Sequence, residues 1–259
     1  MTTEPRSLAD LAAEADEAAR TGTAIAQFTH SQPLGVADAY AVQAMSFSRR
    51  LARGESMVGV KMGFTSRAKQ IQMGLDDVIW GRLSDAMRVA DNGELSLSGY
   101  VHPRVEPEIA FLLGDHLGGR VSAAEAMLAV EGVAPAAEII DSRFENFSFA
   151  LPDVIADNSS SSGFVVGRWN DPATAISNLG MVLEEDGRAV QIGSSAAILG
   201  DPVRSLVEAA RIVGEAGMRL EPGWIVLAGG ATAAHHLRSG STYRIVVEEL
   251  GTVGFSVVE

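Results

Sequence analysis

The stretch YVHPRVEPEIAFLLG, residues 100–114, carries two glutamates, Glu106 and Glu108, inside an otherwise apolar run. As a strand, it presents both carboxylates on one face, because successive side chains alternate between the two faces of a sheet. Pro107 between them has no backbone N–H, which predicts an edge or bulged strand. The stretch therefore predicts a strand with two neighbouring carboxylates on one face.

Two more ionisable residues lie in apolar sequence: Glu138 in VAPAAEIID, residues 133–141, and Lys61 in VGVKMGFTS, residues 58–66. Burying an unpaired carboxylate costs several kcal/mol, roughly, so three such acids indicate a bound cation. Oxygen ligands favour Mg²⁺ or Mn²⁺ over zinc and leave positions for water and substrate. The alternative is a solvated strand face. We expect a divalent-metal enzyme.

Composition narrows the class of protein. The chain has 259 residues, 47% of them hydrophobic, which suffices for the core of one domain. A net charge of −13 argues against nucleic acid or an anionic membrane as partner, so small substrates are expected. The absence of Cys excludes thiolate sites and disulfides. We expect a cytoplasmic protein, because no secretory signal and no apolar run near ~20 residues is present.

The spacing of apolar residues predicts two amphipathic helices near the N-terminus, one around residues 8–19 and one over residues 36–53. We expect residues 1–55 to form an N-terminal helical region. Residues 56–259 are expected to form the β-rich, metal-binding catalytic part, with both parts integrated into one domain.

From Met57 onward, short apolar runs alternate with Gly, Asp and Ser, which predicts a strand-rich body. Asp186-Gly187 indicates a hairpin turn. Helices are predicted over 122–131, where Ser122 and Glu125 form a capping box, and from Asp201-Pro202 through 215. The predicted strands are MVGVKMGF (57–64), YVHPRVEPEIAFLLG (100–114), VAPAAEIID (133–141), SGFVVG (162–167), the two arms of MVLEEDGRAVQIG (181–193), WIVLAGG (224–230), TYRIVVEEL (242–250) and TVGFSVVE (252–259).

The chain resembles the fumarylacetoacetate hydrolase superfamily, and within it the branch of hydratases and decarboxylases of catechol meta-cleavage pathways. The stretches that carry the resemblance are VGVKMGFTSRAKQIQMG, HPRVEPEIAFLLG, EIIDSRFENFSF and VIADNSSSSGFVVG, in that order. The resemblance implies an α+β fold, a mixed β-sandwich roll with flanking helices. It also implies that Glu106, Glu108 and Glu138 bind the metal and that Lys61 is an active-site base or electrostatic group.

The residues before an aromatic–Gly pair help to choose the reaction. In the family that this chain resembles, hydratases carry a PDFG motif at this position and decarboxylases carry PIYG. This chain has Val78-Ile79-Trp80-Gly81. Hydration needs a group that activates water, so Ile79 in place of an acid favours decarboxylation. Val78 in place of proline, and the serine run 159–162, depart from the family pattern and predict a changed pocket.

The resemblance thus implies decarboxylation of 2-oxo-3-hexenedioate to 2-hydroxypenta-2,4-dienoate and CO₂, with a divalent metal that stabilises charge at the keto oxygen. Lys61 as an ammonium would hold the keto oxygen or the carboxylate, and as an amine would move a proton. The alternative is an ion pair with a structural glutamate.

Several polar residues are candidates for substrate contact. Arg143 would neutralise a substrate carboxylate or pair with Asp141, a supporting residue beside the site. Arg67 and Lys69 follow Thr65-Ser66 at a predicted helix start, where an anion can bind, although a solvated helix face is the favoured alternative for Lys69. The remaining candidates are Asn158 and Ser160, which also fit a supporting role, and, by resemblance, Gly230 and Thr232.

Other functions stay open at this point. The rivals are a 2-hydroxypenta-2,4-dienoate hydratase and a non-catalytic, metal-binding partner of a hydratase. A carbon–carbon hydrolase is disfavoured, because His30 is the only histidine of the N-terminal region and has no acidic neighbour. The pair His235-His236 is expected at the surface rather than on a metal. The family implies a homo-oligomer, and the apolar C-terminal strands indicate an interface.

Overall fold

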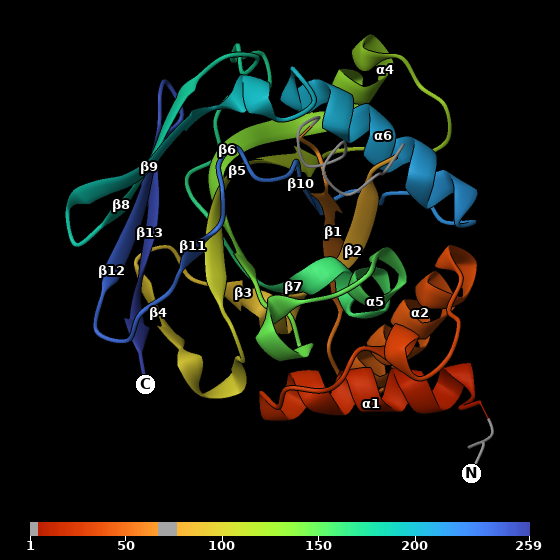
Figure 1. Ribbon diagram of the computed structural model, residues 1–259. Helices are drawn as coiled ribbons and strands as arrows, with labels where there is room; N and C mark the ends of the chain where they lie inside the picture. The colour runs from red at the N-terminus through yellow and green to blue at the C-terminus, as the bar shows by residue number, and fades with distance from the viewer. Residues whose placement is uncertain (1–4, 67–76) are drawn as a thin grey trace.

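Two mixed β-sheets form the body of the protein in this computed structural model, which describes residues 5–66 and 77–259 (Figure 1). The larger sheet has the order β2-β1-β10-β5-β6-β7-β3, with β11 also paired to β5. Its strands are β1 (Met57–Gly63), β2 (Ile79–Ser84), β3 (Arg88–Val89), β5 (Arg104–Leu113), β6 (Val130–Ile140), β7 (Ser161–Val166), β10 (Ile225–Leu227) and β11 (His235–His236).

The smaller sheet has the order β4-β13-β12-β8-β9. Most neighbouring strands are antiparallel, but β1 and β10, β3 and β7, and β4 and β13 are parallel pairs. This mixture confirms the predicted α+β sandwich roll. The strands of the smaller sheet are β4 (Gly93–Ser96), β8 (Gly180–Glu185), β9 (Arg188–Ser194), β12 (Thr242–Val247) and β13 (Gly251–Val258).

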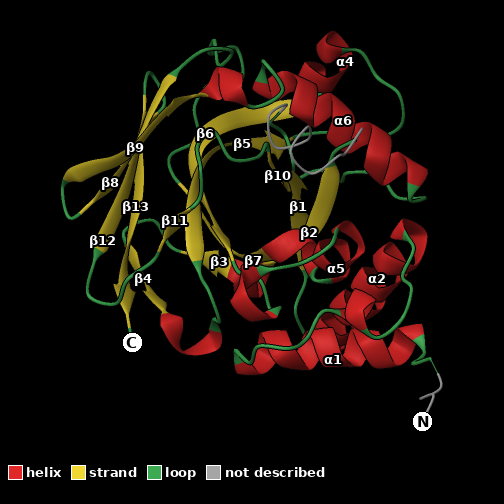
Figure 2. Cartoon of the chain, in the orientation of Figure 1, coloured by secondary structure: helices red, strands yellow, loops and turns green. Residues whose placement is uncertain are grey.

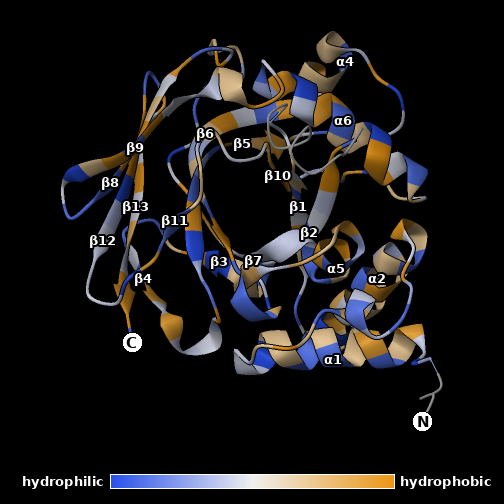
Figure 3. Cartoon of the chain, viewed as in Figure 1, coloured by the Kyte–Doolittle hydropathy of each residue, from blue (hydrophilic) through white to orange (hydrophobic). Residues whose placement is uncertain are grey.

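Helices cover the larger sheet in two groups (Figure 2). α6 (Pro202–Glu215) packs on β1 and β2 and contacts α4 (Ala123–Leu128), whereas α1 (Leu8–Thr21), α2 (Val36–Ala52) and α5 (Leu151–Ala156) form the other group. Hydrophobic and hydrophilic residues alternate along α6, whose apolar face is buried (Figure 3). Neither these helices nor any other in the described ranges is long and apolar enough to cross a membrane.

The main hydrophobic core lies between the two sheets, where β12 and β13 contact β6. Phe111 and Val133 from the larger sheet are completely buried there, together with Tyr243 from the smaller sheet. The apolar side chains of the two C-terminal strands are therefore used inside the chain. The expected oligomer interface at these strands stays a prediction.

The predicted local signals give the expected elements. Asp186 and Gly187 both have positive φ, 51° and 76°, and join β8 to β9 as a hairpin. Ser122 and Glu125 form the capping box of α4, and Asp201 caps α6. The helix predicted over 122–131 is too long, because α4 ends at Leu128 and β6 begins two residues later. β2, β3, β4 and β11 were not predicted.

Pro107 does not mark an edge strand, contrary to the sequence prediction. β5 lies inside the larger sheet, with β6 along one side and β10 and β11 along the other. The Pro107 carbonyl accepts a hydrogen bond from Ala231 N–H in the segment that joins β10 to β11. Because both backbone groups of a strand residue face the same side, the missing donor faces this break in the neighbouring strand.

Candidate metal centre and substrate cavity

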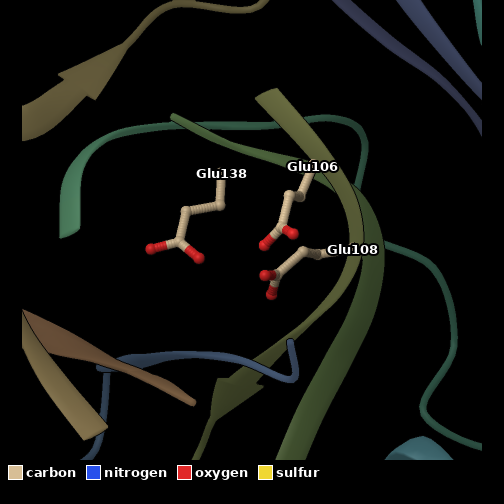
Figure 4. Close-up of side chains that lie close together, drawn as sticks. All are labelled: Glu106, Glu108 and Glu138. Atoms are coloured by element: carbon tan, nitrogen blue, oxygen red, sulfur yellow. The ribbon is translucent and has the colours of Figure 1, made fainter. Parts of the chain in front are cut away.

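The pairing of β5 with β6 gathers the three glutamates. Glu106 lies directly opposite Glu138 across the ladder, and Glu108 is two residues further along the same face of β5. One carboxylate oxygen from each residue lies within 4.8 Å of the others, and the carboxylates point toward one another (Figure 4). The solvated-face alternative is excluded for this strand face, because Glu106 is only 7% exposed and the other two are completely buried.

The negative charge of this buried cluster favours the binding of a cation. Burial raises the pKa of Glu108 well above its usual range, and the neighbouring Glu138 carboxylate raises it further while Lys61 opposes the shift. Burial also raises the pKa of Glu138, against the attraction of Lys61. Both pKa shifts reflect the free-energy cost of holding several carboxylates together without water.

The residues fit a divalent metal. Among the described residues, Glu108 Oε1 and Glu138 Oε2 are buried and accept no hydrogen bond. Buried polar atoms without partners are rare, and carboxylate oxygens are the ligands that hard divalent cations prefer. Glu106, Glu108 and Glu138 therefore form a suitable three-carboxylate set. Within residues 5–66 and 77–259, no second group of three metal-ligating side chains lies this close together.

Two glycines in the segment after β10 contribute to the positions of the Glu106 and Glu108 carboxylates. Gly229, at a φ of +108°, donates its N–H to Glu108 Oε2 at 2.7 Å. A Cβ on Gly230 would lie 2.7 Å from the carboxylate carbon of Glu106. Gly229 thus stabilises one carboxylate and Gly230 leaves room for the other.

Lys61 lies on β1 with its ammonium 3.0 Å from Glu138 Oε1, and its side chain is almost completely buried. The ion pair predicted as one alternative is therefore present, but its partner is a member of the carboxylate cluster rather than a separate structural glutamate. Lys61 also lines the adjoining cavity.

A cavity of about 300 Å³ opens beside the cluster. Its wall includes Lys61, Glu106, Ser159 and Ser160 as polar residues, together with the guanidinium-bearing Arg104. The apolar wall comes from Phe64, Ile79, Ile140, Phe147, Phe149 and Val154. Ile79, singled out from the sequence, thus makes its position on the cavity wall apolar.

A left-handed turn carries Ser160 to this cavity. Asn158, Ser159 and Ser160 have φ values of 51°, 53° and 60°, a conformation that costs about 1–3 kcal/mol for each non-glycine residue. Ser159 Oγ donates to Trp80 C=O at 2.7 Å, which ties the turn to β2. Within the described residues, the buried Ser160 Oγ has no hydrogen-bond partner, so it remains available to a ligand.

The structure places Asn158 in a supporting position. Its side chain accepts from Arg82 N–H at 2.8 Å and donates to Arg82 C=O at 2.9 Å, so both ends of the amide are occupied. Asp141 likewise supports the site by accepting from the N–H groups of Val101 and His102, just before β5.

Arg143 does not line the cavity. Its guanidinium donates to the carboxylate and backbone carbonyl of Asp157 and to Ser162 Oγ, and it is 4% exposed. The predicted pairing with Asp141 is corrected to Asp157. Burial raises the pKa of Asp157 to about 6, although Arg143 opposes this shift.

The other predicted contacts fall in different places. Thr65 packs against Gly229, and neither it nor Ser66 is part of the cavity wall. Thr232 donates to the carbonyl of Ala233, and Ala233 and Ala234 line the cavity instead. Arg67 and Lys69 lie outside the described residues.

The three histidines considered from the sequence are not members of the carboxylate cluster. His235 bonds to Glu185 at 3.1 Å and is half-buried, whereas His236 is exposed. His30 is exposed in the short 3₁₀ turn after α1.

Arg104, Phe147 and Phe149 are cavity residues that the sequence prediction missed. A signal for Arg104 was present, because it shares the face of Glu106 and Glu108 by strict alternation along β5. The two phenylalanines come from the irregular segment between β6 and α5, whose path no sequence pattern indicates.

Known proteins share the sequence pattern and the fold of this chain. Residues 57–258 match the family model described as the fumarylacetoacetate (FAA) hydrolase C-terminal region, and the chain belongs to this family. The resemblance inferred from the sequence is thereby confirmed.

Among its relatives, the chain is 56% identical over 246 residues to a 4-oxalocrotonate decarboxylase from a Pseudomonas species, covering 95% of this chain and 96% of the relative. It is 34% identical to a 2-keto-4-pentenoate hydratase from Paraburkholderia xenovorans, over 92% and 90% of the two chains. A solved 4-oxalocrotonate decarboxylase from Pseudomonas putida G7, complexed with magnesium and adipate, superposes with a TM-score of 0.94 at 35% identity, covering 97% of each chain.

Proposed function

We propose that this protein is a divalent-metal-dependent decarboxylase that converts 2-oxo-3-hexenedioate, also called 4-oxalocrotonate, to 2-hydroxypenta-2,4-dienoate and CO₂. The observation that carries the proposal is a buried three-carboxylate cluster at a cavity whose wall at Ile79 is apolar. The 56% identity to a protein of this activity supports it.

Glu106, Glu108 and Glu138 would hold Mg²⁺ or Mn²⁺. Magnesium is favoured because the solved relative from Pseudomonas putida G7 contains it. Bound there, the metal supplies Lewis-acid stabilisation of negative charge on the substrate's oxygen atoms. The α-keto acid end of the substrate would accordingly lie beside Glu106 and Lys61.

The reaction breaks the C5–C6 bond of the substrate. The electron pair of that bond forms C4=C5, the former C3=C4 pair forms C2=C3, and the carbonyl pair moves to the C2 oxygen, while C6 leaves as CO₂. One proton must then reach the C2 oxygen to give the enol product. Lys61, whose ammonium lies beside Glu138 in the cavity wall, would stabilise and protonate that oxygen.

The rest of the wall suits this chemistry. Phe147, Phe149 and Val154 make this part of the cavity wall apolar, and Ile79 offers no group that activates water for addition to the product. Ser160 Oγ is positioned to donate a hydrogen bond to a substrate oxygen. These features favour release of the dienoate over its hydration.

The alternative is that the protein is a 2-hydroxypenta-2,4-dienoate hydratase. The 34% identity to a 2-keto-4-pentenoate hydratase supports this alternative. The retained Lys61 and carboxylates argue against a non-catalytic partner. Homo-oligomerisation, association with a hydratase and a cytoplasmic location remain predictions.

The test is kinetic. Purified protein is given 2-oxo-3-hexenedioate or 2-hydroxypenta-2,4-dienoate, with Mg²⁺ or with EDTA, and ultraviolet absorbance and CO₂ are followed. Metal-dependent CO₂ release from the first substrate is the expected result. Consumption of the dienoate alone would make the protein a hydratase, and silence with both would contradict the proposal.

A further inference from the structure

We infer that Arg104 is the specificity-determining residue that binds the second carboxylate of the substrate, the one remote from the keto group. This inference rests on the proposed function, in that it assumes the α-keto acid end at the carboxylate cluster. It assigns to Arg104 the role that the sequence suggested for Arg143.

The first support is position. Arg104, Glu106 and Glu108 follow one another on the same face of β5. Two strand residues span about 6.6–6.8 Å, so the guanidinium-bearing residue lies one such step from the nearest carboxylate. That step is comparable to the extended carbon chain that separates the keto group from the remote carboxylate.

The second support is the state of the Arg104 side chain. Its Nε is buried and, within residues 5–66 and 77–259, has no hydrogen-bond partner. Its guanidinium carbon lies 3.8 Å from the centroid of the Phe147 ring, so the ring holds the plane of the fork. A buried donor without a partner, fixed in orientation at a cavity wall, is arranged for an incoming acceptor.

The third support is that two other cations considered for the site, both within the described residues, are already engaged. Lys61 is paired with Glu138, and Arg143 is enclosed by Asp157 and Ser162. Glu106, two residues along β5, is the acidic group of the described cavity wall whose charge acts on Arg104, and the wall also includes the apolar Phe147 and Ile140. A planar guanidinium binds both oxygens of a carboxylate, which distinguishes a dicarboxylate from a monocarboxylate.

The ion pair between Arg104 and the remote carboxylate of the substrate has a predictable effect on kinetics. The remote carboxylate becomes neutral CO₂ in the reaction, so its attraction to Arg104 weakens as the transition state forms. Arg104 therefore contributes to substrate binding and orientation, and its loss raises KM more than it lowers kcat.

The test uses binding of unreactive analogues to the Mg²⁺-loaded protein, measured by calorimetry. 2-Oxoadipate carries the remote carboxylate and 2-oxohexanoate does not, while both keep the α-keto acid end. The ratio of their Kd values is compared for the wild type, Arg104→Met, Arg104→Lys and Arg188→Met. Arg188 is an exposed arginine on β9 and serves as the matched control.

The expected result is a preference for 2-oxoadipate of about 10- to 100-fold in the wild type and in Arg188→Met. Arg104→Met should abolish the preference while leaving the Kd of 2-oxohexanoate unchanged, and Arg104→Lys should restore part of it. A preference that survives in Arg104→Met would overturn the inference.

The outcome is separable from that of the proposed function. If the wild type releases CO₂ but Arg104→Met keeps the preference, the inference alone fails. If the wild type releases no CO₂ but prefers 2-oxoadipate, and Arg104→Met lacks this preference, the proposed reaction alone fails. A general loss of binding for both analogues in Arg104→Met, with circular dichroism unchanged, would assign Arg104 to the structure of the site and also overturn the inference.

Discussion

The ammonium of Lys61 lies 3.0 Å from Oε1 of Glu138, and both side chains are buried in the larger sheet. β1 and β6 are not neighbours in that sheet, so the pair crosses β10 and β5 on the side of the carboxylate cluster. Lys61 offsets part of the charge of the three glutamates and still reaches the cavity. Its structural and chemical roles are therefore compatible with each other.

Replacing Glu108 or Glu106 by Gln should abolish metal-dependent turnover, because each change removes one anionic ligand from a three-carboxylate set. The Mg²⁺ affinity should fall at least about 100-fold, while the fold persists since Gln has the same shape. Calorimetric titration with Mg²⁺ measures the affinity. Glu131→Gln, at the exposed residue near the start of β6, is the matched control. Full activity in both site variants would rule out the triad.

Lys61→Met should lower kcat about 10²- to 10⁴-fold, because the group that stabilises and protonates the C2 oxygen is lost. Mg²⁺ should still bind, since the three carboxylates remain. The metal-free variant should be less stable than the metal-free wild type, because Glu138 loses its buried cation. Single-turnover kinetics and denaturant unfolding measure the two effects. Loss of metal binding instead would show that Lys61 is purely structural.

Ile79→Asp tests the choice between decarboxylation and hydration. Ile79 lies in the cavity wall and pairs with Gly63 across β1 and β2, so a carboxylate there would face the ligand. The ratio of hydration to decarboxylation should rise, and Ile79→Asn, which is similar in size but uncharged, controls for the lost apolar contact. An unchanged ratio in both variants would remove Ile79 as a discriminator between the two reactions.

Gly230→Ala should weaken Mg²⁺ binding about 10- to 100-fold, because its new Cβ would lie 2.7 Å from the carboxylate carbon of Glu106 and would displace it. Gly99→Ala is the control, since no heavy atom lies within 4 Å of its new Cβ. Calorimetry with Mg²⁺ compares the two variants. Equal affinity in both would mean that Glu106 is not a ligand or that it moves without cost.

Asp157 should make stability depend on pH. Its pKa is about 6 in the fold and 3.8 in an unfolded chain, so the folded protein binds this proton more tightly. The contribution is present below pH 4 and is lost as the pH rises through about 6, a loss of roughly 3 kcal/mol. Urea unfolding of the wild type and Asp157→Asn between pH 4 and 7 measures the difference. The wild type should lose stability relative to Asp157→Asn as the pH rises, and a gain in stability relative to this variant would mean that Arg143 outweighs burial.

The sequence was most informative where local rules apply. Alternation along residues 104–113 placed Glu106 and Glu108 on one face, and the Asp186-Gly187 signal gave the hairpin, because both depend on backbone geometry within a few residues. The boundary at residue 55 stays a prediction, although the matched family region begins at residue 57.

The failures occurred where partners are distant along the chain. Pro107 was predicted on an edge because a sequence does not show that the neighbouring strand is interrupted beside it. β2 was missed because all of its residues are buried and no alternation marks it. Arg143 was considered for a substrate carboxylate or for Asp141 because of its proximity to Glu138 in sequence, whereas its guanidinium turns to Asp157.

The sequence by itself determined the chemistry: three carboxylates and a lysine in apolar runs, a combination that is costly to bury without a cation. Only the tertiary structure decided which residues meet. The register of β5 against β6 sets Glu106 opposite Glu138, and the curl of the sheet brings Lys61 to them and Phe147 to Arg104. The reason is physical, since burial cost is a property of each residue, whereas contacts depend on strand order and on the packing of segments far apart in the chain.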